Sequence, residues 1–294
     1  VIQMTQDDAH HYVRPDQIEN EVADLMKLIK EFYSHFNMPM SFNLATRPEN
    51  SMGDPKVWTE AEKDLESALK KAKVKYQIKE KDGAFYGPKI DINVTDSQNR
   101  EWTVATIQLD FQMPEKFELE YVAEDGSKKR PVMIHRAIAG TFERFIGIII
   151  EHFQGKFPLW LAPVQAVLIP ITKKQEEFAK KVYEKMKENE IRTDIYNSGE
   201  TLDKRIRETE LQKIPYTLVI GEKEETKKTV STRHYRRGDE GELKEEPKTF
   251  TSPEITDTGT VKTETFIGND AILLHLIIDK LIKKMKTEIK NKTI

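Results

Sequence analysis

Cysteine is absent from the 294-residue sequence, so the chain forms no disulfide and offers no thiolate to a metal. Long apolar runs are absent too. No stretch approaches the roughly 18 residues that suggest a membrane-spanning helix, and the first residues do not resemble a secretion signal. Together these absences predict a cytoplasmic protein with no membrane association.

The sequence also lacks a large excess of charge of either sign. It has 47 Lys and Arg against 50 Asp and Glu, which gives a net charge of −3. Any surface that binds nucleic acid must therefore be a local basic patch, because the overall charge does not attract a polyanion.

The length is sufficient for two domains of ordinary size, each with its own core. Two prolines interrupt the pattern at Phe157–Pro163, and the order of predicted elements changes beyond them. We therefore predict one domain over 1–160 and a second over 161–294. The sequence opens on Val1 inside a strand-like stretch, and we expect part of the first domain to lie upstream of it.

In the first domain, the patterns predict an antiparallel sheet that carries helices, an α+β fold. The clearest signal is a hairpin in which Lys89–Val94 alternates apolar and polar residues, Asp96–Asn99 supplies a turn, and Trp102–Phe111 returns as a strand. Apolar periodicity predicts helices over 16–36, 60–72 and 139–153. Shorter strands are expected at 40–45, 76–78, 118–122 and 130–136.

The second domain alternates strands with helices, which predicts an α/β unit with a largely parallel sheet. Strands are expected at 167–171, 192–196 and 216–220, and helices at 174–188, 201–211 and 270–289. Residues 238–265 are rich in Lys, Glu and Thr without an apolar period, so we predict an exposed insertion there.

Several polar groups could carry chemistry, although each taken alone also has a structural explanation. His10 and His135 could be satisfied core histidines, Arg144 could be one half of an ion pair, and Tyr86–Pro88 could be a simple turn. Spacing alone does not pair His10 with His135.

Taken in order, however, six blocks resemble the threonyl-tRNA synthetase family of class II aminoacyl-tRNA synthetases. The similarity is continuous from Val1 to about Arg237. The blocks are Thr5–His10, Gly83–Ile90, Ile107–Phe111, Pro131–Ile138, Glu143–Gly147 and Trp160–Gln165. The implied fold is a partial class II catalytic core followed by an α/β anticodon-binding domain.

The resemblance implies an ATP-dependent threonine–tRNA ligase with a zinc ion that binds the amino and hydroxyl groups of threonine. His10 and His135 match two of its three protein ligands. The third ligand in the family is a cysteine, expected upstream of Val1. A metal that requires a hydroxyl ligand explains how threonine is separated from valine, since an apolar pocket distinguishes such near-isosteres by only about 10²-fold.

Further roles are implied for the residues around the metal. Asp8 would accept a hydrogen bond from the threonine hydroxyl, and Tyr86 and Gln108 would hold its amino end. Gln6 and Lys89 would lie near the carboxylate or the α-phosphate. In the ATP site, the resemblance places Arg144 on the γ-phosphate, Thr141 beside the adenosine, and Mg²⁺ between the phosphates.

The second domain would read the anticodon of tRNA(Thr) through Glu224 and Arg233, which match base-contacting positions of the family. Lys204, Arg205 and Arg207 could approach the RNA backbone, but surface charges are usually just solvated. The whole enzyme is expected to be a homodimer, whereas this fragment alone should activate threonine poorly.

The sequence departs from the family at Trp102–Thr106, where Thr103 replaces a glutamine, so Thr103 is doubtful as a substrate contact. Two alternatives remain open. One is a synthetase-like RNA-binding regulator without catalysis. The other is a sister class II enzyme of the prolyl, histidyl or seryl type.

Overall fold

The computed structural model describes residues 2–228, 230–234, 248–249, 253–255, 261–263 and 281–291. The chain divides into two compact units, Val1–Phe153 and Gln154–Ile294. Within the described residues, no helix combines the length and apolar character needed to cross a bilayer.

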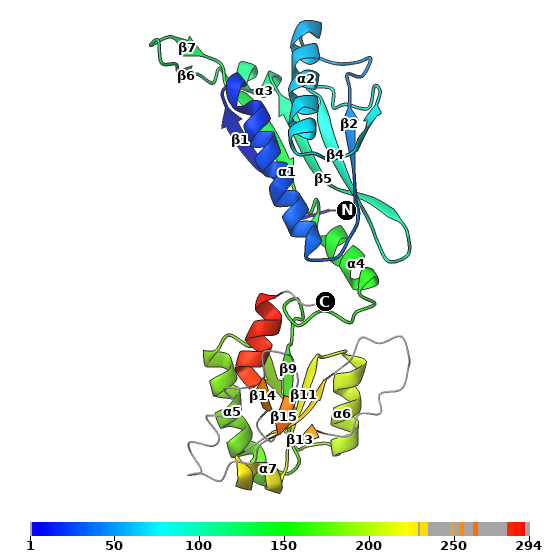
Figure 1. The fold of residues 1–294 in the computed structure, drawn as a ribbon, viewed down its shortest axis with the longest axis vertical. Coiled ribbons are helices and arrows are strands. Elements are labelled where there is room, and N and C mark those ends of the chain that lie inside the picture. Colours follow the sequence, from blue (N-terminus) through cyan, green and yellow to red (C-terminus); the bar gives the residue numbers. More distant parts are fainter. Residues whose placement is uncertain are drawn as a thin grey trace. The chain divides into compact units, whose positions relative to one another are not determined.

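Unit 1 contains a six-stranded sheet in the order β1-β8-β5-β4-β2-β3 (Figure 1). All neighbouring strands are antiparallel except β2 and β3, so the predicted antiparallel sheet is confirmed. Its strands are β1 (Ala9–Val13), β2 (Met40–Ala45), β3 (Tyr76–Lys79), β4 (Lys89–Thr95), β5 (Glu101–Asp110) and β8 (Val132–Ala137). A separate small hairpin pairs β6 (Tyr121–Val122) with β7 (Lys128–Lys129).

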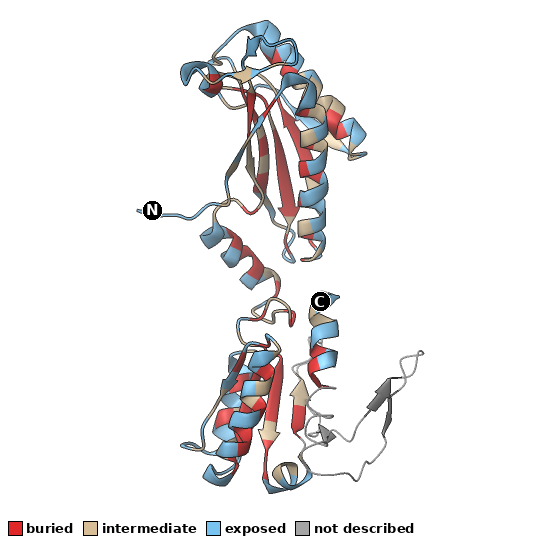
Figure 2. Ribbon diagram, turned by 90° about the vertical axis from the view of Figure 1, so that its left-hand side faces the viewer, coloured by how far each residue is buried: buried red, intermediate tan, exposed pale blue. Residues whose placement is uncertain are grey.

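Helices α1 (Ile18–Ser34) and α2 (Pro55–Lys71) lie on one face of this sheet (Figure 1). The apolar residues of β4 and β5 that point to this face, such as Ile90, Ile92 and Ile107, are buried, and the buried strands of the sheet are visible in Figure 2. On the other face the sheet carries polar side chains. The remaining helical segments of unit 1 are η1 (Pro15–Gln17), α3 (Gln112–Lys116) and α4 (Phe142–His152).

Helix α2 begins five residues before the predicted start at Glu60. Pro55 occupies its first turn, and the side chain of Asp54 accepts a hydrogen bond of 2.8 Å from the Lys56 N–H. An Asp-Pro pair is a helix-start signal, so the predicted boundary was wrong because periodicity outweighed the cap.

Unit 2 is an α/β unit with the strand order β10-β9-β11-β12-β13. The first three strands are parallel, and β12 and β13 extend the sheet antiparallel, so the largely parallel sheet is confirmed at its centre. The strands are β9 (Ala166–Pro170), β10 (Thr193–Ile195), β11 (Tyr216–Ile220), β12 (Ser231–His234) and β13 (Lys248–Thr249), with helical segments η2 (Lys173–Gln175), α5 (Glu176–Glu188), α6 (Leu202–Leu211) and α7 (Glu222–Lys227).

Two apolar clusters lie on opposite faces of the unit 2 sheet. Residues of α5 and of a helix over 281–290 pack on one face, and α6 covers the other. The helix over 281–290 confirms that part of the predicted C-terminal helix; residues 270–280 lie outside the described residues. Within the predicted insertion, the structure describes only β13 and a hairpin of β14 (Pro253–Ile255) with β15 (Val261–Thr263).

The turn between β4 and β5 depends on Asp96, whose side chain is fully buried. Its carboxylate accepts hydrogen bonds from the N–H groups of Gln98 and Arg100, the Arg100 guanidinium and the Trp102 indole, at 2.7–3.0 Å. Burial raises the pKa of this carboxyl, but the hydrogen bonds outweigh it, so the net effect lowers the pKa strongly.

Asp96→Asn is expected to destabilise unit 1 by about 2 kcal/mol at pH 7, because the amide cannot accept all four hydrogen bonds. A lowered folded-state pKa contributes stability above the unfolded pKa of about 3.9, and this contribution is lost as the pH falls through the folded pKa. Urea unfolding between pH 7 and pH 3 measures this effect. The difference in the free energy of unfolding between wild type and Asp96→Asn should become smaller below about pH 4.

The matched control is Asp125→Asn in the β6–β7 turn, where the exposed carboxylate bonds only Ser127 within this turn and approaches Lys129. An equal loss in both variants would show that the burial of Asp96 is unimportant.

Candidate functional site

Four of the residues singled out in the sequence form one row across the polar face of the unit 1 sheet. His10 of β1 is paired with His135 of β8, His135 with Gln108 of β5, and Gln108 with Lys89 of β4. Directly paired residues of an antiparallel sheet point to the same face. The register therefore brings together four side chains from strands far apart in the sequence.

The two imidazoles are in direct contact, with ring centroids 4.6 Å apart and planes at 86°. Tyr86 lies beside them, its ring 5.5 Å from that of His135, and its hydroxyl donates a hydrogen bond to the Gln108 side chain. Burial, and then the negative charges of Asp110 and Asp8, raise the pKa of Tyr86. Tyr86 is therefore a protonated donor at neutral pH.

Lys89 is held at the end of the row by Asp91. Its ammonium is 2.6 Å from the Asp91 carboxylate, which is 5% exposed and whose other oxygen has no hydrogen-bond partner within the described residues. The charge of Lys89 is thus fixed in place, three residues after Tyr86 in the chain.

The segment before β1 is fastened to the start of α4. Gln6 forms a bridge with Thr141, and the Phe142 N–H donates to the Thr5 carbonyl at 2.8 Å. Asp7 accepts hydrogen bonds from the N–H groups of Ile138 and Ala139 at 2.9 and 3.0 Å. Gln6 and Asp8 flank Asp7 and are both exposed.

Arg144 reaches back from α4 to the sheet, where its guanidinium donates to the Thr103 carbonyl at 2.8 Å. The hydroxyl of Thr103 donates to the Asn93 side chain at 2.7 Å. Thr103 therefore positions Arg144 through its backbone.

In unit 2, Glu224 and Arg233 lie on neighbouring elements. The Glu224 carboxylate accepts the Gly221 N–H at 2.9 Å and the Ser231 hydroxyl at 2.8 Å, and Ser231 is two residues before Arg233 on β12. The Arg233 guanidinium is 3.9 Å from Glu210 of α6. Both side chains are partly exposed.

The suggested basic cluster at 204–207 is wrong for Arg205, which is 3% exposed. Its guanidinium donates to the carbonyls of Pro170, Tyr196 and Ile171 at 2.6, 3.1 and 3.2 Å. A basic residue in the sequence does not reveal whether its charge faces solvent or buried carbonyls, and here the carbonyls hold it.

Three aspartates at the site were not predicted to have a role: Asp7, Asp91 and Asp110. Asp110 is 1% exposed and lies 2.9 Å from the Nε2 atom of His135. Burial raises its pKa, but hydrogen bonds from His135 and from the N–H groups of Met113 and Gln112 outweigh this, so the net effect lowers the pKa. The alternation of β5 could have indicated Asp110, since it follows Gln108 by two residues.

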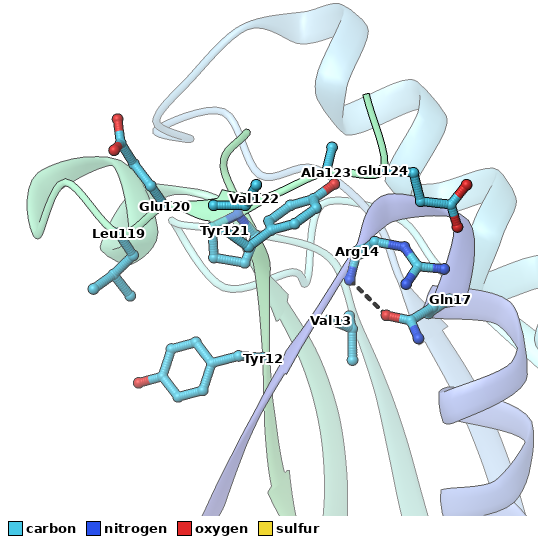
Figure 3. A pocket seen from close by; sticks show the side chains of 11 residues that line it. Tyr12, Val13, Arg14, Gln17, Leu119, Glu120, Tyr121, Val122, Ala123 and Glu124 are labelled. Atoms are coloured by element: carbon cyan, nitrogen blue, oxygen red, sulfur yellow. Dashed lines mark hydrogen bonds between the residues drawn. The ribbon is translucent and has the colours of Figure 1, made fainter. Parts of the chain in front are cut away.

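A pocket of about 500 Å³ lies elsewhere in unit 1, between the end of β1 and the segment 119–124 (Figure 3). Tyr12 and Tyr121 line it, and the guanidinium of Arg14 at its edge is paired with Asp16. None of the predicted site residues lines this pocket, so it is separate from the row of four.

Known proteins resemble this chain in both sequence and fold. Residues 1–153 match the tRNA synthetase class II core domain (G, H, P, S and T), and residues 165–247 match an anticodon binding domain. The threonine–tRNA ligase of Caldanaerobacter subterraneus subsp. tengcongensis is 50% identical over 81% of this chain and 37% of its own length. That of Clostridium botulinum is 45% identical over 98% of this chain and 40% of its own length.

Among solved structures, the RNA binding domain of threonyl-tRNA synthetase from Cryptosporidium parvum Iowa II superposes with a TM-score of 0.77 at 35% identity, covering 97% of this chain and 64% of that one. The chain spans about two fifths of the length of the curated relatives it matches. By its catalytic-core match and these relatives, the chain belongs to the class II tRNA synthetases, in the threonyl-tRNA synthetase family.

Proposed function

We propose that this chain is the part of a threonine–tRNA ligase that carries one side of the threonine and ATP site together with the anticodon-reading domain. The observation that supports this most is the row of His10, His135, Gln108 and Lys89 on one sheet face. It joins two metal-ligand side chains, an amide and a cation within one site, as a substrate with amino, hydroxyl and carboxylate groups requires.

The amino-acid end of the site would bind zinc through His10 and His135. Their donor set fits zinc, which imidazole nitrogens commonly ligate, although within the described residues no group of three or more His, Asp and Glu side chains could hold a metal ion. The family resemblance supplies a third ligand, a cysteine, from upstream. Bound zinc would provide an open coordination position for the hydroxyl of threonine, a position that the methyl group of valine cannot fill.

Around this centre the chain's own residues would orient threonine. Asp8 would accept from its hydroxyl, and Tyr86 and Gln108, already hydrogen-bonded to each other, would hold the amino group. Lys89 and Gln6 would lie against the carboxylate or the α-phosphate. The pairing of Lys89 with Asp91 supports this role because it limits the motion of the ammonium group.

Activation would proceed by attack of the threonine carboxylate on the α-phosphorus of Mg²⁺-bound ATP. A carboxylate oxygen–phosphorus bond forms, the bond to the β-phosphate bridge breaks, and pyrophosphate leaves. Arg144 would neutralise the γ-phosphate, and Thr141 would lie beside the adenosine. A hydroxyl of the 3′-terminal adenosine of the tRNA then attacks the threonyl carbonyl, and AMP leaves.

The partners of the whole enzyme are proposed with this activity. Glu224 and Arg233 would contact anticodon bases of tRNA(Thr), and the full-length protein would act as a cytoplasmic homodimer. The hydrogen bonds that hold Glu224 leave its carboxylate oxygens with further accepting capacity, which supports a role in binding base N–H groups.

The test is threonine-dependent exchange of pyrophosphate into ATP by this chain joined to the upstream segment of the Caldanaerobacter relative. The proposal requires exchange with threonine and rejection of valine by about 10⁴-fold, as for a site built around a hydroxyl. Exchange with valine or proline at the threonine rate would contradict the assignment, and absence of exchange with retained tRNA(Thr) binding would favour the regulatory alternative.

His135→Ala in this extended protein is expected to lower the preference for threonine over valine to about 10²-fold or less, because only an apolar pocket would then separate them. Selectivity is measured as the ratio of kcat/KM values. His11→Ala is the matched control, since His11 is the neighbour of His10 but points to the helix-covered face and bonds Glu21.

A further inference from the structure

Asp110 is a buried carboxylate at the end of β5 to which the proposed function gives no role. One oxygen, Oδ1, accepts the N–H groups of Gln112 and Met113 at 2.7 and 3.0 Å, at the start of α3. The other, Oδ2, lies 2.9 Å from Nε2 of His135. The carboxylate is therefore fixed on both sides.

This contact determines which nitrogen of His135 carries the proton in the neutral ring. An ionised carboxylate only accepts hydrogen bonds, so Nε2 must be the donor and the lone pair must lie on Nδ1. A metal binds a neutral imidazole through its lone pair. The contact with Asp110 thus leaves Nδ1 as the only nitrogen of His135 that can bind a metal.

The imidazole of His10 is less constrained than that of His135. No residue within the described part of the chain hydrogen-bonds the ring of His10, which is exposed and only touches His135 edge-on. His135 is held in one tautomer and one orientation before any metal binds. His10 has no hydrogen bond within the described residues that would fix its tautomer or orientation.

We propose that Asp110 is a positioning residue for zinc, which keeps His135 in the Nε2–H tautomer with Nδ1 free to bind the metal. The proposal rests on the proposed function, because that function supplies the metal. Carboxylates that orient metal-binding histidines in this way raise metal affinity by about 10- to 100-fold.

Asp110→Asn gives a specific test because the two N–H groups at the start of α3 determine the orientation of the new amide. Its oxygen must accept from Gln112 and Met113, so its NH₂ group must face His135 and donate to Nε2. The tautomer of His135 is then expected to switch to Nδ1–H. Asp110→Ser, which can still cap α3 but does not reach the ring, should give a mixture of both tautomers.

Long-range ¹H–¹⁵N correlation spectra of the histidine-labelled 294-residue chain at pH 8.5 report the tautomer directly. Glu21→Gln is the matched control. It removes the carboxylate that lies 2.7 Å from Nδ1 of His11, and it should change the signals of His11 only. A His135 that keeps the Nε2–H tautomer in both Asp110→Asn and Asp110→Ser would overturn the proposal.

Zinc retention is the second readout, measured in the extended protein after dialysis against a buffered chelator. We expect Asp110→Asn to lower the zinc affinity by about 10- to 100-fold. Equal zinc affinity in wild type and variant would overturn the positioning role. Threonine-dependent exchange by the wild-type extended protein tests the proposed function separately, since it requires no change at Asp110.

Discussion

Gly87→Ala is expected to destabilise unit 1 by about 3 kcal/mol, because the backbone at this position lies against β5. A Cβ atom on Gly87 would lie 1.8 Å from the carbonyl oxygen of Leu109 and 2.9 Å from its carbonyl carbon. Leu109 is in a central strand and donates its N–H to the Pro88 carbonyl at 3.1 Å, so neither segment can move without breaking this contact. Urea unfolding at pH 7, with hydrogen exchange of β5 peptides, measures the loss.

The same substitution should disturb the site, since Gly87 lies between Tyr86 and the strand that begins at Lys89. Displacing this loop would separate the Tyr86 hydroxyl from Gln108. Gly147→Ala in α4 is the control: nothing lies within 4 Å of its added Cβ, and replacing a helical glycine should stabilise by about 0.5–1 kcal/mol. Equal effects at both glycines would refute the close-approach argument.

The requirement for glycine at position 87 shows what the sequence could and could not predict. Gly87 followed by Pro88 indicates a turn, and this is as far as local sequence goes. That the turn lies on the backbone of Leu109, 22 residues later, is a property of the folded sheet. The family resemblance predicts that Gly83–Ile90 belongs to a site, but it gives no physical reason for this glycine.

The elements themselves were largely predictable. Strong alternation in β4 and β5 and the turn at Asp96 defined the hairpin, and apolar periodicity defined α1 and α5, because each of these signals is local. Helix α7 and strand β12 were missed: α7 is six residues long with no buried residue, so it has no apolar period to detect.

The row across the sheet could not be predicted from the sequence, because strand register depends on pairing between distant segments. Alternation places Lys89 and Gln108 on some face of their strands but does not say that they are opposite each other. A β-bulge leaves Val104 of β5 unpaired between the pairs Ile92–Ala105 and Asn93–Thr103, which shifts the pairing by one residue, and no residue pattern in either strand indicates it. The resemblance predicts the residues of the candidate site, and the register gives their arrangement.

In unit 2, the sequence likewise does not predict which charged side chain is buried. Arg205 looks like its neighbours Lys204 and Arg207 in the sequence, yet only Arg205 is buried. It lies where β9 and β10 end. Its guanidinium donates to the carbonyls of Pro170 at the end of β9, of Tyr196 just after β10, and of Thr201, the N-cap residue of α6. Burial lowers the pKa of Arg205, which reflects the cost of holding a charge away from water. The hydrogen bonds to carbonyls offset this cost.

Arg205→Met is therefore expected to destabilise unit 2 by about 4 kcal/mol. The methionine can fill part of the volume, but the carbonyls of Pro170, Ile171 and Tyr196 lose their shared donor. The bond to Pro170 is buried and the other two are partly buried, and an acceptor left unpaired away from water costs roughly 1–3 kcal/mol. The stability of Arg205→Lys should fall between those of wild type and Arg205→Met. One ammonium group cannot replace a planar group that bonds three carbonyls at once. Urea unfolding followed by hydrogen exchange of peptides from each unit measures the effect.

Arg207→Met is the matched control, because Arg207 is exposed on the same helix and its loss should change stability by less than about 0.5 kcal/mol. Slower exchange in β9 of Arg205→Met than in Arg207→Met would be incompatible with the role given to Arg205.

The prediction also bears on RNA binding. Arg205 sits at the carboxyl ends of the parallel strands, the edge at which α/β sheets commonly bind ligands. Its removal should therefore weaken the proposed anticodon binding through loss of this edge, in proportion to the unfolding measured. Removal of a residue that contacts RNA directly would weaken that binding without changing the stability of unit 2.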